Sequence, residues 1–230
     1  MSTYNGEKYL TEQIKSILGQ TNHDWHLYIR DDGSHDATQD IIRQFANSSN
    51  QVSFVNNKKV TNIGVVKSFT SLLRNTQADF YMFSDQDDFW KPSKVQDTLN
   101  EMLKHDYKNI PVCVHTDLTV VDKELREIQA PTKQVWSSFE RLLFWNCVTG
   151  CTMMINKKLK EKVQFDNLNY NYIYMHDWWL ALVASSLGEV VYLDKKTMLY
   201  RQHGNNVEGS LKENTLKTVF HRVTHYEYDR

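Results

Sequence analysis

Apolar residues in the first half of the chain follow two spacings, which predict helices and strands in alternation. Apolar positions separated by three or four residues, the period of a helix with one buried face, occur in 10–18, 36–45, 65–75 and 92–103. Short apolar runs typical of strands occur at 25–30, 52–55 and 79–83. Because strands and helices that alternate in this way form crossover units, the pattern predicts an α/β fold with a mostly parallel central sheet flanked by helices.

Individual residues mark where these elements begin and end. Gly19 is placed to end the first helix, Ser34 or Asp36 to cap the second, and Pro92 to open the fourth. Only residues 1–3 precede the first turn, so the first strand is expected to be short and to leave an unpaired position in the sheet.

The second half of the chain has a less regular pattern. Two helices are expected there, at 137–144 and 176–186. The expected strands are 112–116 and 119–122, which flank a turn, then 151–155, 190–193 and 197–201. No repeat, low-complexity tract or linker interrupts the sequence, so we expect one domain over 1–210 that consists of the halves 1–105 and 106–210. The polar tail 211–230 carries a loose helical stripe of apolar residues and is expected to pack on the domain, with a membrane surface or a partner as the alternatives.

Composition and charge narrow the class of protein. The 27 basic and 28 acidic residues give a net charge of -1, which gives no support for broad binding to nucleic acid or to an acidic membrane. The cysteines are Cys113, Cys147 and Cys151, an odd and sparse set that fits a reduced compartment better than a disulfide framework. Together with the lack of a signal-peptide pattern, the cysteines predict a cytoplasmic location. No apolar run is long enough to span a bilayer.

The segment Asp85-Gln86-Asp87-Asp88 carries the strongest chemical signal. It follows a predicted buried strand, and ligands in parallel sheets gather at the carboxyl ends of strands. Neighbouring carboxylates repel one another unless a cation holds them, and hard oxygen ligands suit Mg²⁺ or Mn²⁺ bound together with substrate phosphates. The alternative is a solvated acidic turn, which the position between a buried strand and Phe89 disfavours.

Two further motifs are ambiguous by themselves. Asp31-Asp32-Gly33-Ser34 ends another predicted strand, where a carboxylate can accept a hydrogen bond from a base or a ribose, but an Asp–Gly turn is the commoner use. His176-Asp177 could cap a helix, act in catalysis or belong to the metal dyad of a phosphohydrolase, and no matching set of further ligands supports the last.

Taken together, the motifs resemble those of glycosyltransferase family 2, which has the GT-A (Rossmann-like) fold. The matching segments run in consistent order from 1 to 207: Ser2-Thr3-Tyr4-Asn5-Gly6, Asp31-Asp32-Gly33-Ser34, Asn62-Ile63-Gly64, Ser84-Asp85-Gln86-Asp87-Asp88, Asn146-Cys147-Val148-Thr149-Gly150, His176-Asp177-Trp178-Trp179 and Tyr200-Arg201-Gln202-His203. Within the family the chain looks most like bacterial rhamnosyltransferases of surface polysaccharide synthesis. The resemblance implies a nucleotide-sugar half at 1–105 and a smaller acceptor half at 106–210.

The resemblance also implies roles for individual residues, with Asp177 as the catalytic base. The residues implied to bind the nucleotide sugar are Thr3, Tyr4, Asp32, Asp85 and Arg201. The implied metal ligands are Asp87 and His203, and Asn146, Thr149, Trp178 and Trp179 are implied to face the acceptor.

The implied reaction is an inverting transfer that depends on Mg²⁺ or Mn²⁺. The donor would be dTDP-rhamnose or a UDP-sugar, and the acceptor would be a saccharide or a lipid-linked sugar. The enzyme would be cytoplasmic and could also contact the inner face of the cell membrane peripherally. A sugar nucleotidyltransferase is an alternative, but a Gly-rich basic loop would be expected where Tyr4-Asn5-Gly6-Glu7 stands. A non-catalytic nucleotide- or sugar-binding module is another, favoured by the short first strand and disfavoured by Asp87 and Asp177.

Overall fold

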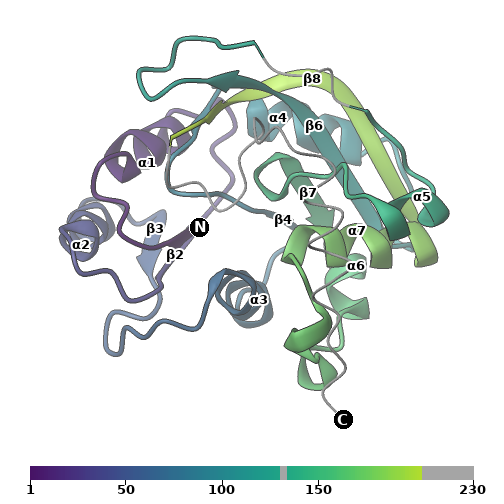
Figure 1. The fold of residues 1–230 in the computed structure, drawn as a ribbon, viewed down its shortest axis with the longest axis horizontal. Coiled ribbons are helices and arrows are strands. Elements are labelled where there is room, and N and C mark those ends of the chain that lie inside the picture. Colours follow the sequence, from purple (N-terminus) through teal and green to yellow (C-terminus); the bar gives the residue numbers. More distant parts are fainter. Residues whose placement is uncertain (130–133, 204–230) are drawn as a thin grey trace.

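A small parallel sheet forms the N-terminal side of the molecule (Figure 1). The computed structural model describes residues 1–129 and 134–203. The sheet has the order β1-β2-β3, with β1 at Ser2–Thr3, β2 at Leu27–Asp31 and β3 at Val52–Phe54. The short first strand is paired, because Ser2 and Thr3 lie in parallel register with Arg30 and Asp31.

Three helices connect and cover these strands, as the helical spacing predicts. They are α1 at Leu10–Leu18, α2 at Thr38–Ser48 and α3 at Val65–Asn75. Leu10, Ile14 and Ile17 of α1 are buried in one apolar cluster with Ile29 of β2, which confirms the predicted inner face. The expected cap at Ser34 or Asp36 is wrong, because the N-cap of α2 is Ala37, which makes no side-chain cap bond; Asp36 lies just before it and its Oδ1 accepts the Thr38 N–H at 3.0 Å.

A second sheet, mixed in direction, forms the other half of the molecule. Its order is β4-β7-β6-β8-β5, and only β6 and β8 pair in parallel there. The strands are β4 at Phe80–Met82, β5 at Phe89–Trp90, β6 at Val112–Val121, β7 at Met153–Asn156 and β8 at Glu189–Arg201. The α/β class is confirmed, with an all-parallel part confined to the first three strands.

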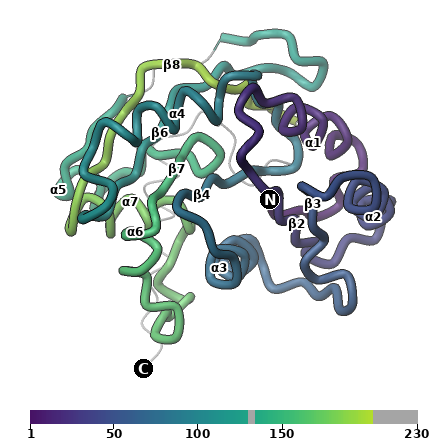
Figure 2. The backbone as a smooth tube through the Cα atoms, turned by 180° about the vertical axis from the view of Figure 1, so that it is seen from behind, coloured from purple at the N-terminus to yellow at the C-terminus, as the bar shows by residue number. Residues whose placement is uncertain are grey.

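Helices cover both faces of this second sheet (Figures 1 and 2). Val112 and Val114 of β6 pack with Met102 of α4, whereas the intervening Cys113 packs in the cluster that contains Leu180 of α7. Because successive strand residues point to opposite faces, α4 and α7 lie on opposite sides of the sheet. The bounds are α4 at Lys94–Met102, α5 at Phe139–Phe144, α6 at Lys157–Lys162 and α7 at His176–Leu187, with short 3₁₀ turns at Gly150–Thr152, Phe165–Asn167 and Tyr170–Tyr172.

Two predicted strand pairs are wrong, because each is one continuous strand. Residues 112–116 and 119–122 were expected to flank a turn, but β6 runs through them, and β8 likewise joins 190–193 to 197–201. The register between β6 and β8 shifts at Thr116, Asp117 and Thr119. At these shifts β8 carries extra residues opposite β6, so the two strands stay paired through the polar positions, which the alternation of apolar residues does not reveal.

The tail 211–230, which was expected to pack on the domain, lies outside the described residues. Among the helices in 1–129 and 134–203, none combines the length and apolar character that crossing a bilayer requires. The division into the halves 1–105 and 106–210 stays a prediction.

A close backbone contact at the end of α7 gives a test of the packing. A Cβ at Gly188 would lie 1.9 Å from the Pro111 carbonyl oxygen. We expect Gly188→Ala to lower the free energy of unfolding by roughly 1–3 kcal/mol, because backbone would have to move. Gly19→Ala is the control, since its Cβ would meet nothing nearer than 3.4 Å. Urea unfolding of both variants checks this, and equal stability of the two would contradict the contact.

Candidate active site

The loop 84–88 joins β4 to β5 and lies at the centre of the predicted site residues. Asp87 Oδ2 lies 2.8 Å from His203 Nε2, so the structure brings the two predicted metal ligands together. The ring of Tyr9 stacks on the His203 ring with centroids 4.9 Å apart. Arg201 Nε donates to the Asp87 carbonyl at 2.8 Å, which fixes the backbone of the loop beside the end of β8.

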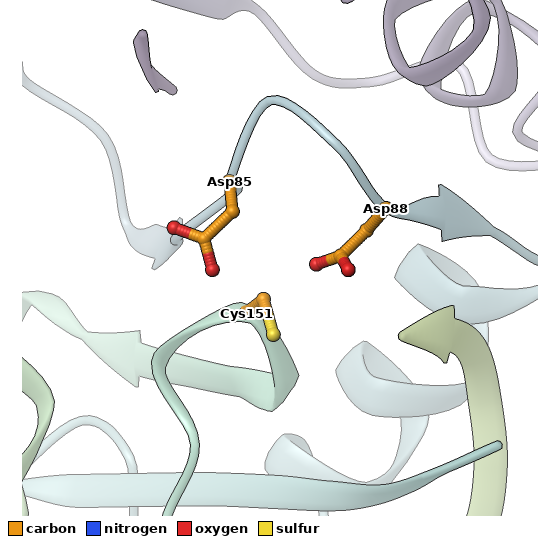
Figure 3. A group of neighbouring side chains, drawn as sticks. All are labelled: Asp85, Asp88 and Cys151. Carbon is orange, nitrogen blue, oxygen red and sulfur yellow. The ribbon is translucent and has the colours of Figure 1, made fainter. Parts of the chain in front are cut away.

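Asp85 and Asp88 project from the two ends of this loop toward Cys151 (Figure 3). Their ligand atoms and the thiol sulfur all lie within 4.8 Å of one another. Burial, together with the negative charges of Asp87 and Asp177, raises the pKa of Asp85 to about 7. Burial also raises the pKa of Asp88 well above its ordinary value. These carboxylates therefore hold protons more readily than exposed ones, unless a cation stabilises their charge.

The chemistry of the donor atoms decides which of these groups fits a divalent cation. Burial raises the pKa of the Cys151 thiol well above its ordinary value, so the sulfur stays protonated and is a poor ligand for Mg²⁺ or Mn²⁺. Asp85 and Asp87 offer carboxylate oxygens, which such ions prefer. Asp88 is fully buried, and its Oδ2 has no hydrogen-bond partner among the described residues. The set that fits the ion is thus Asp87 and His203 with Asp85 nearby, and Cys151 forms the wall behind it.

Asp177 lies in the first turn of α7, where backbone groups orient its carboxylate. Its Oδ2 accepts the Gly150 N–H at 2.8 Å, and its Oδ1 accepts the Trp178 N–H at 2.6 Å. The side chain of Asn146 lies 3.4 Å from Oδ1. Asp177 is only 7% exposed, and its charge acts on Asp85, so it belongs to the same site as the acidic loop.

The residues predicted to face the acceptor have different surroundings. Trp178 Nε1 donates to the Leu142 carbonyl at 2.6 Å, which ties α7 to α5. Trp179 Nε1 is buried and has no hydrogen-bond partner among the described residues. The Thr149 carbonyl accepts from Thr152 in the 3₁₀ turn, so this residue shapes the turn that places the Gly150 N–H. Their contacts with an acceptor stay predictions.

Several residues predicted to bind the nucleotide are buried and hold neighbouring backbone in place. Asp32 is 5% exposed, pairs with Arg30 at 2.6 Å, and accepts the N–H groups of Ile63 and Gly64 at 2.8 and 2.9 Å. Asp32 thus holds the loop that follows β3. Gly64 has φ +83° at the end of that loop, a conformation that favours glycine.

The other predicted nucleotide residues divide into buried and open ones. Thr3 is buried and its Oγ1 donates to Asp31 at 3.1 Å, whereas Tyr4 is 48% exposed and free to meet a ligand. The guanidinium of Arg201 is 2% exposed and donates to the carbonyls of Asp87 and Lys123 and to Glu12. Arg201 therefore belongs to a hydrogen-bond network around the acidic loop. Its contact with the diphosphate stays a prediction.

Sequence reasoning missed two buried members of this site. It did not distinguish Asp88 from the other acidic residues of the loop, and it did not place Cys151 in the site. Asp88 was visible only as one of several acidic residues, and it differs from them because Arg201 N–H donates to its Oδ1 at 3.2 Å. Cys151 lies more than sixty residues from the loop in sequence, and a lone cysteine gives no signal.

Comparison with known proteins identifies the family. The sequence model described as "Glycosyl transferase family 2" matches residues 1–163. The chain belongs to glycosyl transferase family 2. A protein of Shigella flexneri called "dTDP-rhamnosyl transferase RfbG" is 33% identical over 91% of this chain and 74% of its own length. The expectation of a family 2 glycosyltransferase is confirmed by these matches.

Other relatives and solved structures agree with this assignment. A Bacillus subtilis protein called "Putative teichuronic acid biosynthesis glycosyltransferase TuaG" is 25% identical over 95% of this chain and 83% of its own. S. aureus TarS 1-349 in complex with UDP-GlcNAc has a TM-score of 0.65 at 21% identity, covering 89% of this chain and 58% of that one. The mannosyltransferase PcManGT from Pyrobaculum calidifontis, solved with GDP-Man and Mn²⁺, has a TM-score of 0.59 at 15% identity and covers 89% of this chain and 56% of that one. These likenesses establish the fold, and the chain spans less than two thirds of the solved chains.

His176, the neighbour of Asp177, has an environment that makes stability depend on pH. It is 4% exposed, its ring stacks on Phe69 at 4.2 Å, and neither ring nitrogen has a hydrogen-bond partner among the described residues. Burial lowers its pKa from 6.5 to about 3. The folded protein thus keeps a neutral imidazole where the unfolded chain takes up a proton, so stability present above pH 6.5 is lost as the pH falls toward 3.

We expect His176 to account for a loss of roughly 2 kcal/mol in the free energy of unfolding between pH 7.5 and pH 5. His176→Leu should have a shallower dependence, whereas His23→Gln, at an exposed position, should keep that of the wild type. Urea unfolding at both pH values measures it. An unchanged slope in His176→Leu would show that the imidazole is not held neutral.

Proposed function

We propose that this chain is an inverting, metal-dependent glycosyltransferase that moves a sugar from a nucleotide diphosphate donor to a saccharide or lipid-linked acceptor. Rhamnose is the sugar we favour, and cell-surface polysaccharide synthesis is the process. The observation that carries the proposal is the position of Asp177, a buried carboxylate held by two backbone N–H groups next to the acidic loop. The relative named as a dTDP-rhamnosyl transferase supports rhamnose, and the relative named as a putative teichuronic acid biosynthesis glycosyltransferase supports the process.

The donor end of the site is formed by the acidic loop and the residues beside it. Asp87 and His203, which meet at 2.8 Å, would hold Mg²⁺ or Mn²⁺ with Asp85 nearby. A bound divalent ion supplies electrostatic stabilisation of the negative charge that develops on the leaving diphosphate. Tyr4, with its exposed ring, would pack against the base, and the loop held by Asp32 would close the pocket around it.

The acceptor end is formed by Asp177 and the residues that orient it. The acceptor hydroxyl must lose a proton as it attacks the anomeric carbon, and a positioned carboxylate can take that proton. Both oxygens of Asp177 accept one backbone N–H each, which fixes the plane of the carboxylate toward which the hydroxyl would approach. A single displacement with a base on the acceptor side inverts the anomeric centre.

The location and the acceptor belong to the same proposal. We propose a cytoplasmic enzyme that meets its acceptor at the inner face of the cell membrane. A sugar nucleotidyltransferase and a non-catalytic binding module are the alternatives, and sugar transfer by the wild-type protein, measured below, separates a transferase from both.

Asp177→Asn tests the base. The amide cannot take a proton, so we expect transfer to fall by at least a hundredfold, the scale of general-base contributions. Metal-dependent binding of the nucleotide should change little, because Asp177 lies on the acceptor side. Sugar transfer from dTDP-rhamnose and UDP-sugars is measured together with calorimetric binding of dTDP and UDP. Normal transfer in the variant would show that another group is the base, and binding without transfer in the wild type would favour the non-catalytic module.

Asp87→Ala tests the donor end. Removing this carboxylate should abolish the part of dTDP or UDP affinity that depends on Mn²⁺, because the ion loses a charged ligand. Calorimetry with and without Mn²⁺ gives the comparison, and Asp40→Ala is the control, since Asp40 pairs with Arg43 on the exposed surface of α2. Metal-dependent affinity that survives in Asp87→Ala would place the ion elsewhere.

A further inference from the structure

The side-chain amide of Gln86 joins two loops of the site that are far apart in sequence. Its Oε1 accepts the Tyr4 N–H at 2.7 Å, and its Nε2 donates to the Tyr4 carbonyl at 3.0 Å. One amide thus satisfies both backbone groups of a single residue, as a neighbouring strand would.

We propose that Gln86 is a positioning residue that fixes the segment 3–6 against the acidic loop 84–88, and so sets the separation between the base and diphosphate subsites. The inference rests on the proposed function, because it assigns the base to the first segment and the diphosphate to the second.

The glycine at position 6 supports this role independently of the hydrogen bonds. A Cβ there would lie 2.4 Å from Oε1 and 2.6 Å from Cδ of Gln86. Such a distance is incompatible with a side chain, so the amide lies directly against the Cα of Gly6. Because the clashing atoms are the end of a flexible side chain, alanine at position 6 would displace the Gln86 amide rather than the backbone.

The segment 3–6 keeps its own anchors to the N-terminal half. The Asn5 N–H donates to Ser34 Oγ and the Gly6 N–H to Thr38 Oγ1, each at 2.8 Å. Residue 3 is also paired in β1. Loss of the Gln86 amide would therefore leave the base side of the pocket folded.

The acidic loop has anchors of its own as well. Gln13 Nε2 donates to Ser84 Oγ at 2.8 Å, and Arg201 Nε donates to the Asp87 carbonyl at 2.8 Å. The metal side should thus persist without Gln86. The Gln86 amide adds a fixed distance and orientation between two segments, each of which is held in place by other contacts.

This arrangement affects ligands according to how much of the site they span. A nucleoside would contact only the base segment, and a metal ion only the acidic loop. A nucleoside diphosphate with its metal must reach both, so it gains from a fixed separation in the way a bivalent ligand gains from matched sites. A mutation that loosens the relation should weaken only the spanning ligand.

Calorimetry with three probes tests this: uridine or thymidine alone, Mn²⁺ alone, and UDP or dTDP with Mn²⁺. Gln86→Ala should weaken the nucleotide–Mn²⁺ complex roughly tenfold, the effect of losing two neutral hydrogen bonds, and change the nucleoside and Mn²⁺ affinities by less than about twofold. Gln86→Asn, one methylene too short to reach, should behave like the alanine variant. Gln96→Ala is the matched control, because the Gln96 amide likewise donates to Asn100 and accepts from Asn22, but on α4.

Gly6→Ala provides a second route to the same displacement. It should cost the nucleotide–Mn²⁺ complex as much as Gln86→Ala, and the double variant should cost no more than either, since the amide is lost only once. Additive losses, equal losses for all three probes, or no loss in Gln86→Ala would each overturn the role of Gln86. A wild-type protein that binds no nucleoside diphosphate would instead overturn the proposed function and this inference with it, so the two failures are distinguishable.

Discussion

Repulsion among carboxylates is the constraint on which the site depends. The carboxylates of Asp85, Asp87, Asp88 and Asp177 belong to one site, in which Asp88 and Asp177 are buried and the charges of Asp87 and Asp177 contribute to the raised pKa of Asp85. Such a group is stable only if donors or cations compensate the charge. Backbone N–H groups orient Asp177, and the Arg201 N–H binds Asp88, while the space beside Asp87 and His203 suits a divalent ion.

The fold provides these compensating groups from elements that lie far apart in sequence. The first sheet places the segment that follows β1 beside the acidic loop through Tyr4, and the second sheet contributes the end of β8 that carries Arg201. The N-terminus of α7 adds Asp177, whose partner Gly150 comes from the 3₁₀ turn before β7. Two rigid sheets therefore hold one polar site between them, and Gln86 links their loops.

Much of the fold and part of the site could be predicted because their signals are local. The spacing in 10–18 and 65–75 specified α1 and α3, and the acidic run after a buried strand located the loop 84–88. The pairing of Asp87 with His203 followed from the family resemblance and is present in the structure. The continuity of β6 could not be predicted, because its pairing with β8 continues through register shifts at which β8 carries extra residues, and these do not show in the alternation of β6.

The sequence by itself determined the class of fold, the family and the residue types that bring charge to the site. Those properties follow from periodicity and from short motifs, in which neighbours in sequence act together. Only the tertiary structure decided that Asp32 supports a loop, that Cys151 closes the wall behind Asp85 and Asp88, and that Gln86 meets Tyr4. Each of these contacts joins residues separated by about thirty to more than eighty positions in the sequence. Whether such distant residues meet is decided by how the two sheets pack, which local sequence patterns do not encode.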